Sequence, residues 1–311
     1  MSTPPVVAAV DGSDDSLRAL DWALGAARRR SAPLRVVYAR QYAPWSQPDV
    51  LVTGPPEPPD DSVLDQARDH LRGRDEGLTV EYSAPVGAPA VVLPELSSTA
   101  QLLVLGSRGR GGFASLLLGS NSLAAARDAV CPVVVVPRPG RDGGTSHAFG
   151  AVGEHGEAPD GPGPRVVVGL YVDVPDEAAL AFAFAEAALL RARLQVIAAY
   201  PWPVTGLAAP GELVPPALDQ SAIERETWTL ADGLLAPHLK AQPDVHSEVC
   251  ALPGDAAGHL VAASRDAELV VVGRHRRRLL APARMMGSVT QAVLLHAVSP
   301  IAVVPPVPAE D

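Results

Sequence analysis

The chain has 311 residues and a formal net charge of −10 at pH 7, and 47% of its residues are hydrophobic, 19% charged and only 4% aromatic. This length is enough for two domains, and the hydrophobic share excludes a disordered protein. The negative charge argues against a nucleic-acid partner, because non-specific nucleic-acid binding needs a basic surface. It is typical of a soluble protein, and we expect a cytoplasmic one.

The sequence also argues against membrane, disulfide-linked and metal-binding proteins. The N-terminus carries no secretory signal, and the longest apolar helical stretch, residues 178–190, is too short to cross a bilayer. We expect this stretch to be a buried core helix. Cys131 and Cys250 lie outside any C-x-x-C pattern, and the histidines lack metal-ligand spacing, so we assign no disulfide and no metal site.

The chain starts with the pattern of a buried strand followed by a helix. Residues 6–10 are apolar, Asp11, Gly12 and Ser13 interrupt them, and apolar residues then recur at helical spacing over residues 17–27. Asp and Ser are common helix N-caps, so Asp11 could simply cap this helix, and Ser13 suits a cap better than a ligand.

Two more apolar strands follow in the first half of the chain. Residues 34–39 end at Ala39, and residues 102–105 are apolar throughout. The Pro-rich residues 43–60 between them predict a long loop. Apolar strands that alternate with helices are typical of a parallel sheet covered on both faces, so the sequence predicts a doubly wound α/β fold.

The last of these strands leads directly into a glycine motif. Gly106-Ser107-Arg108-Gly109 is followed nine residues later by Gly119-Ser120, which gives the spacing G-x2-G-x9-G-S. Glycines allow close approach of the backbone to a ligand, and a Gly-Ser that opens a helix offers N–H and hydroxyl donors to phosphate. The motif is neither a Walker loop nor the G-x-G-x-x-G dinucleotide fingerprint. Arg108 and Arg110 could clamp phosphates or could be ordinary loop arginines.

The two halves of the chain repeat each other. Residues 119–137 and 287–305 share the order Gly-Ser, helix, Pro, strand, with a constant offset of 168 residues. We therefore predict domains at residues 1–138 and 165–311, joined by a flexible linker at 139–164 that is rich in Gly and Pro. The second half also repeats the strands, at residues 166–170, 194–200 and 269–272, and has a Pro-rich loop at 201–216.

With these features, the chain resembles the universal stress protein family in its tandem, two-domain form. The residues that carry the resemblance are Asp11-Gly12-Ser13 after the first strand, the glycine motif, and the helix-Pro-strand endings at Pro132 and Pro300. The resemblance implies two tandem domains, each with a five-stranded parallel sheet and helices on both faces, as in the adenine nucleotide α-hydrolase-like fold. It also implies binding of adenine nucleotides, as in a subset of the family, and a role in stress or dormancy.

The resemblance further implies which residues hold the nucleotide. In the family, the residue at Asp11 recognises adenine or holds nearby water and metal, and backbone groups at Ala39 contact adenine. Asn121 stands where a small apolar residue is common in the family. The expected ligand is ATP, with or without Mg²⁺, and the expected binding residues are Asp11, Gly12, Ser13, Ala39, Gly106, Arg108, Gly109, Gly119, Ser120, Asn121 and Ser122.

The second half departs from this pattern. Tyr171 stands where the first half has Asp11, and Arg276 replaces the second glycine after Gly273. Loss of the acid removes the adenine contact, and a side chain in place of the glycine crowds the backbone, so we expect no ATP binding of the usual kind there. The run Arg274–Arg278 could be an anion or nucleic-acid patch, or could bind another phosphorylated ligand, but a solvated loop is the favoured reading.

These observations predict a nucleotide-dependent regulator in stress or dormancy that has no catalytic residue and is at most a weak ATPase. One alternative is an adenylating or slowly ATP-hydrolysing enzyme of related fold, since residues 11–16 loosely resemble an S-G-G-x-D-S loop. Another is an interaction scaffold without a ligand. The partner protein is not identified by the sequence. We expect the halves to pack as a pseudo-dimer through their last strands, residues 133–136 and 301–304, and a homodimer could also form.

Overall fold

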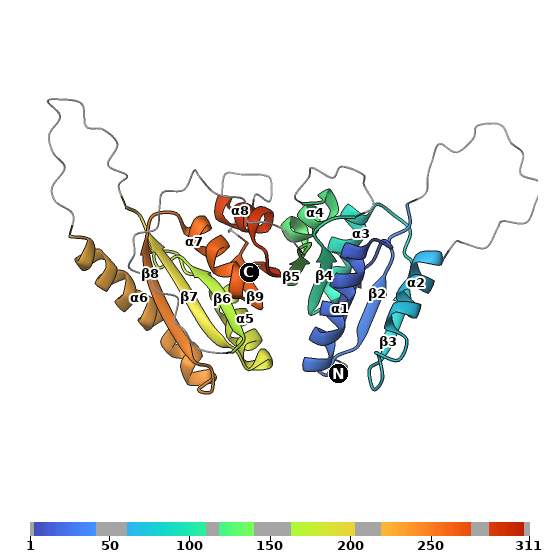
Figure 1. Ribbon diagram of the computed structural model, residues 1–311, viewed down its shortest axis with the longest axis horizontal. Helices are drawn as coiled ribbons and strands as arrows, with labels where there is room; N and C mark the ends of the chain where they lie inside the picture. Colours follow the sequence, from blue (N-terminus) through green and yellow to red (C-terminus); the bar gives the residue numbers. More distant parts are fainter. Residues whose placement is uncertain are drawn as a thin grey trace, which may run out of the picture. The chain divides into compact units, whose positions relative to one another are not determined.

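The computed structural model describes residues 3–41, 61–109, 118–139, 163–202, 219–274 and 286–307. These residues form two compact units, one within residues 3–139 and the other within residues 163–307 (Figure 1). The domain boundaries expected around the linker remain predictions. The two Pro-rich loops, apart from residues 201 and 202, lie outside the described residues.

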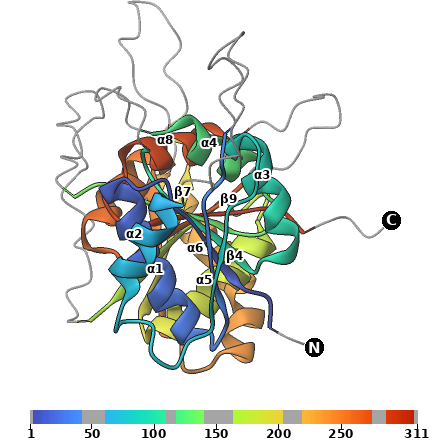
Figure 2. The same cartoon turned by 90° about the vertical axis from the view of Figure 1, so that its right-hand side faces the viewer.

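Over its described residues, the first unit is a five-stranded parallel sheet covered by helices on both faces. The first three strands are added toward one edge of the sheet and the last two toward the other edge. Because connections between parallel strands are right-handed, α1 and α2 cover one face of the sheet while α3 and α4 cover the other (Figure 2). The strands are β1 (Val6–Ala9), β2 (Leu34–Val37), β3 (Val80–Ser83), β4 (Leu102–Gly106) and β5 (Val133–Val136), in the spatial order β3-β2-β1-β4-β5. The helices are α1 (Asp14–Arg29), α2 (Ser62–Leu71), α3 (Pro89–Leu96) with the 3₁₀ turn η1 (Ser97–Thr99), and α4 (Ser120–Asp128).

The second unit has the same architecture over its described residues. Its strands are β6 (Arg165–Leu170), β7 (Arg193–Tyr200), β8 (Ser247–Pro253), β9 (Leu269–Gly273) and β10 (Ile301–Val304), in the order β8-β7-β6-β9-β10. Its helices are α5 (Glu177–Leu190), α6 (Gln220–Ala241), α7 (Ala256–Ala263) with the 3₁₀ turn η2 (Ser264–Asp266), and α8 (Ser288–His296). Helix α5 packs against α6, and α7 packs against α8.

The strand register confirms the repeat that the sequence predicts. In the first unit, Val6 pairs with Leu34 on one side and with Leu102 on the other. In the second unit, Val166 makes the corresponding pairs with its two neighbouring strands, β7 and β9. The predicted α/β fold class is therefore correct for both units.

Both cores are built mainly from Val, Leu and Ala, as the low aromatic content requires. Strands β4, β5 and β10 are buried along their whole length. The core helix expected at residues 178–190 is α5, but it is buried on one face only, with Phe184 at its centre and Ala181 exposed. None of the helices in the described ranges is both long and apolar enough to cross a bilayer.

The two cysteines are free thiols. Burial raises the pKa of Cys131 to about 12 and also raises the pKa of Cys250. A thiol with a raised pKa forms little of the reactive thiolate near neutral pH. Both thiols are therefore poorly reactive near neutral pH.

The packing of α5 against α6 gives a test of the second core. Phe184 is fully buried, and its ring stacks on His238 of α6 with ring centroids 5.2 Å apart. We expect Phe184→Ala to lower the free energy of unfolding by about 3–5 kcal/mol, because it removes a large buried side chain and leaves a cavity. Urea unfolding followed by circular dichroism measures this change. Trp228→Ala on the same helix pair is the control, because Trp228 is 50% exposed and its loss should change stability by no more than about 0.5 kcal/mol.

Candidate functional site

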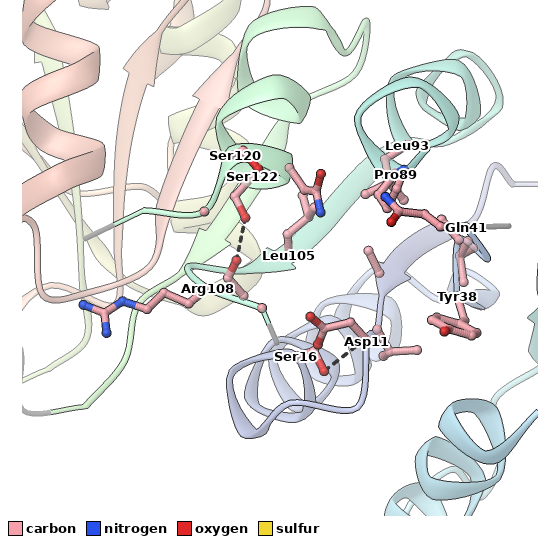
Figure 3. A pocket seen from close by; sticks show the side chains of 18 residues that line it. Asp11, Ser16, Tyr38, Gln41, Pro89, Leu93, Leu105, Arg108, Ser120 and Ser122 are labelled. Carbon is pink, nitrogen blue, oxygen red and sulfur yellow. Dashed lines mark hydrogen bonds between the residues drawn. The ribbon is translucent and has the colours of Figure 1, made fainter. Parts of the chain in front are cut away.

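A pocket of about 540 Å³ opens at the carboxyl ends of β1, β2 and β4 in the first unit (Figure 3). The strand order changes direction between β1 and β4, and open α/β sheets bind ligands at such a switch point. Of the residues expected to bind nucleotide, Gly12 and Ser13 do not line this pocket. The structure brings the other nine together in its wall: Asp11, Ala39, Gly106, Arg108, Gly109, Gly119, Ser120, Asn121 and Ser122.

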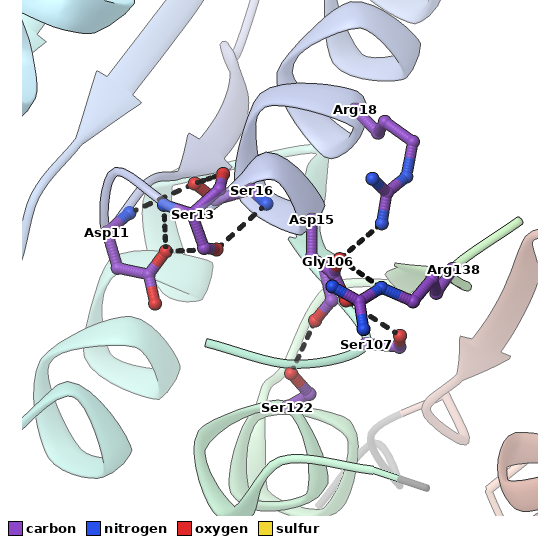
Figure 4. Close-up of polar contacts among 9 residues, drawn as sticks. All are labelled: Asp11, Ser13, Asp15, Ser16, Arg18, Gly106, Ser107, Ser122 and Arg138. Carbon is purple, nitrogen blue, oxygen red and sulfur yellow. Dashed lines mark hydrogen bonds and ion pairs between the residues drawn. The ribbon is translucent and has the colours of Figure 1, made fainter. Parts of the chain in front are cut away.

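Gly12 and Ser13 shape the turn that places Asp11 in the pocket. Gly12 has a φ of +79°, which favours glycine. The Oδ1 atom of Asp11 accepts hydrogen bonds from the Ser13 N–H at 3.0 Å and from the Ser13 hydroxyl at 2.6 Å (Figure 4). Ser13 itself is the N-cap of α1, because its side chain accepts from the Ser16 N–H. Asp11 therefore does not cap α1 but orients the residue that does.

The second oxygen of Asp11 faces the glycine loop. A Cβ built on Gly109 would lie 2.3 Å from Asp11 Oδ2, so a side chain at this position collides with the carboxylate unless Asp11 moves. Gly106 has a different reason to be glycine, since its Cβ would lie 2.7 Å from the backbone of Asp15 in α1. The first glycine of the motif thus lets a helix pack on the strand end, and the second keeps the pocket open beside Asp11.

The start of α4 forms the polar end of the pocket. The Leu123 N–H makes the first hydrogen bond of this helix, to the Gly119 carbonyl at 3.0 Å. The N–H groups of Ser120, Asn121 and Ser122 have no hydrogen-bond partner among the described residues, and the N-cap Gly119 has no side chain to offer one. These open donors are what an anion requires at a helix start.

Two residues of this end have roles that the sequence reasoning assigned differently. The Ser122 hydroxyl donates to the Gly106 carbonyl at 2.7 Å and is buried, so its proton is not directed at a phosphate and its role is to join α4 to β4. The Gly119 N–H donates to the Ser107 carbonyl at 2.8 Å, so it is also occupied. Helix donors for a ligand therefore come from the backbone of residues 120–122.

The opposite end of the pocket is mostly apolar. The Val10 N–H donates to the Val37 carbonyl, and beyond this bond β2 turns away toward β3, where the Tyr38 N–H donates to Ser83. The backbone of Ala39 is consequently left without a hydrogen bond to another described residue. Figure 3 places Tyr38, Gln41, Pro89 and Leu93 at this end, across the pocket from Arg108, Ser120 and Ser122.

Several of these wall residues carry no signal in the sequence that marks them as part of a site. Pro89 and Leu93 come from α3, which ends ten residues before Gly106, and no spacing rule connects them to the glycine motif. The sequence predicts Val10 and Leu105 only as strand residues, although each stands directly before a predicted site residue. Their position at the end of a strand, next to a predicted site residue, is the one feature of the sequence that indicates a place in the pocket wall.

Arg108 is half-buried in the pocket wall and has no carboxylate partner within the described residues, whereas Arg110 lies outside them. Among the described residues that line the pocket, Asp11 is the one carboxylate. No group of three or more His, Cys, Asp or Glu side chains in the described part of the chain could hold a metal ion by itself. The arrangement suits a ligand with an anionic end and a flat apolar end.

The corresponding place in the second unit keeps part of this design. Gly287 is the N-cap of α8 and has no side-chain cap, and the Thr290 hydroxyl donates to the Gly273 carbonyl at 2.9 Å, as Ser122 does to Gly106. Tyr171 follows β6 where Asp11 follows β1, is 50% exposed, and has its pKa raised by a hydrogen bond with Asp173. Arg276 lies outside the described residues.

The loop that carries Tyr171 is also longer than its counterpart. Residues 171–175 separate β6 from the N-cap Asp176, whereas residues 10–12 separate β1 from the N-cap Ser13. The second unit therefore has neither an acid at the position of Asp11 nor the short turn, and the carboxylate beside its Gly273 belongs instead to the N-cap Asp176.

Comparison with known proteins agrees with this duplicated architecture. The model of the universal stress protein family matches residues 3–137 and 164–305. The chain is 32% identical to universal stress protein Rv2005c of Mycobacterium tuberculosis over 305 residues, which cover 96% of each chain, and 29% identical to universal stress protein Rv2623 of that organism, over 96% of this chain and 95% of the other.

A solved structure that matches nearly the whole chain shows the same fold. A universal stress protein from Archaeoglobus fulgidus matches 98% of this chain and 97% of its own with a TM-score of 0.59 and 18% identity. A universal stress protein solved in complex with cAMP matches 44% of this chain and 98% of its own, with a TM-score of 0.34 and 32% identity. The chain belongs to the universal stress protein family, in a tandem form with two family domains.

Proposed function

We propose that the first unit binds ATP in the pocket at the ends of β1, β2 and β4, and that the chain acts as a nucleotide-dependent regulator in stress or dormancy. The observation that carries this proposal is the open start of α4. Three backbone N–H groups that have no partner among the described residues open at one end of the pocket, and Arg108 lines the same end. Backbone donors and a positive helix end are a suitable site for phosphate.

Gly119 supports a ligand at the start of α4, because the fold does not require a glycine at this position. A Cβ there would have no neighbour closer than 3.5 Å, and the backbone φ of −75° suits any residue. Helix N-caps favour Ser, Thr, Asp or Asn, and α1, α5, α6 and α7 all begin with a capping Ser or Asp side chain. Helices α2, α3 and α8 also begin without a side-chain cap, but α2 and α8 do not line this pocket, and α3 starts in its wall with Pro89, which has no N–H to donate. The uncapped start of α4 lies in the pocket wall with its N–H groups open, where a phosphate group can cap it.

The other end of the pocket suits adenine. Pro89, Leu93 and Leu105 offer apolar surface to a flat ring, and the backbone groups of Ala39, which bond to no other described residue, can hydrogen-bond to its edge. Asp11 lies between the two ends, within reach of the middle of a nucleotide (Figure 3). This assignment agrees with adenine-nucleotide binding in a subset of the family.

We also propose that the protein regulates rather than catalyses. Phosphoryl transfer needs a positioned base and an Mg²⁺ scaffold. Asp11, the one carboxylate among the described lining residues, already accepts two hydrogen bonds from Ser13. A ligand that binds only the folded state stabilises it by about 2.7 kcal/mol at one hundred times its Kd. Occupancy by ATP can therefore report the nucleotide level through stability or conformation.

The stoichiometry of ATP binding tests the assignment to one unit. We expect isothermal titration calorimetry to show one ATP site per chain, because Tyr171 replaces the acid and the longer loop changes the turn in the second unit. Gly109→Arg should abolish binding, since its Cβ alone would collide with Asp11. Two equivalent sites per chain would refute the assignment, and a wild-type protein that does not bind millimolar ATP would refute the function.

The capping role of the phosphate can be tested by supplying a competing cap. Gly119→Asp places a carboxylate at the N-cap of α4, where it should add about 0.5 kcal/mol to the stability of the ligand-free protein. It should also weaken ATP binding by at least about tenfold, because it occupies the same donors and repels phosphate. Thermal unfolding with and without ATP measures both effects.

The chain contains a matched control for this variant. Gly287→Asp makes the same change at the N-cap of α8, which is likewise uncapped. It should stabilise the protein similarly and leave the ATP affinity unchanged. If Gly119→Asp binds ATP as tightly as wild type, phosphate does not cap α4.

A further inference from the structure

A buried carboxylate lies beneath the glycine loop, outside the pocket. The side chain of Asp15, in the first turn of α1, is 4% exposed and forms ion pairs with Arg18 and with Arg138, whose Nε atom lies 3.4 Å from Asp15 Oδ1 (Figure 4). Asp15 does not line the pocket and is not among the expected binding residues. A buried charge is unfavourable unless it is paired, and replacing it with apolar groups is often harmless to stability. Asp15 is paired with two arginines and lies in the first helical turn, where a carboxylate is favoured, so the question is what else its contacts hold in place.

Ser107 connects this carboxylate to the pocket. Ser107 is 1% exposed, its N–H donates to the Val136 carbonyl of β5 at 2.9 Å, and its carbonyl accepts the Gly119 N–H at 2.8 Å. Its hydroxyl lies 3.5 Å from Asp15 Oδ2. One residue thus joins the end of β5, the N-cap of α4 and the first turn of α1.

Both neighbours of Ser107 belong to the proposed site. Gly106 packs against the backbone of Asp15, where a Cβ would lie 2.7 Å away, and Arg108 lines the pocket. Arg138 follows β5, the strand to which Ser107 is bonded. A displacement of Asp15 would therefore shift Ser107 and, with it, Arg108 and the start of α4.

We propose that Asp15, held in place by Arg138, is a positioning residue for the phosphate end of the pocket. Asp15 touches no ligand. Through Ser107 it fixes the position of Arg108 and the positions of the backbone N–H groups at the start of α4. This inference rests on the proposed ATP site and adds to it a residue that does not contact the phosphates but contacts Ser107, which adjoins the phosphate end of the pocket. The adenine end, formed by β2 and α3, has no contact with the Asp15–Ser107–Arg138 group and should not depend on it.

Asp15→Asn separates positioning from simple electrostatics, because the two predict opposite signs. Removal of a negative charge near the site would strengthen the binding of a triphosphate if only long-range charge mattered. Positioning predicts that the affinity for ATP falls by about tenfold, a typical size for coupling between sites, while the affinity for adenosine, which has no phosphate, stays within about twofold. Calorimetric titration of the full chain with ATP and with adenosine measures both.

Three further variants keep the test decisive if Asp15→Asn does not fold. Ser107→Ala is uncharged and should reproduce the selective loss for ATP, and Arg138→Met should do so as well, with partial recovery in Arg138→Lys. Arg35→Met, which removes the exposed ion pair of Arg35 with Glu81 at 3.0 Å, is the control and should change neither affinity. If Ser107→Ala or Asp15→Asn binds ATP at least as tightly as wild type, or loses adenosine equally, the positioning role is overturned while the ATP site stands. If wild type binds no nucleotide, both proposals fail.

Discussion

The hydrogen bond from the Ser122 hydroxyl to the Gly106 carbonyl fixes where α4 begins relative to the end of β4. The open donors of α4 lie on one side of this bond and the glycine loop on the other, so the polar end of the pocket depends on it. Thr290 makes the same bond to Gly273 in the second unit. The junction therefore belongs to the duplicated fold itself, and a ligand site is an addition to it.

What the first unit adds to this junction is a short turn with an acid, a glycine beside that acid, and a buried network beneath the loop. Gly12 and Ser13 hold Asp11 against Gly109, and Asp15 pairs with Arg138 under Ser107. The second unit keeps the uncapped helix start but has Tyr171 on a longer turn. The overall charge of −10 does not prevent anion binding at the first unit, because local backbone donors and Arg108 dominate at hydrogen-bond distance.

The sequence predicts the parts of this arrangement that depend on local pattern. The apolar strands, the fixed offset of the repeat and the glycine spacing locate β1, β2, β4, β5 and their copies, and place nine expected residues in one pocket. Strands β3 and β8 and the helices α2, α3, α6 and α7 were not located, because their apolar patterns are weak or are interrupted by polar residues. The hydroxyl role of Ser122, the wall formed by Leu93 and the burial of Asp15 depend on contacts between distant segments, which spacing does not report.

The central claim is that a nucleotide caps α4 and not α8. Amide hydrogen exchange, resolved to the first turn of each helix, tests it most directly, since the N–H groups of residues 120–122 have no partner among the described residues. The account predicts that saturating ATP slows exchange at residues 120–122 and leaves residues 288–290 unchanged. Equal protection of both helix starts, or none at residues 120–122 in a protein that binds ATP, would contradict it.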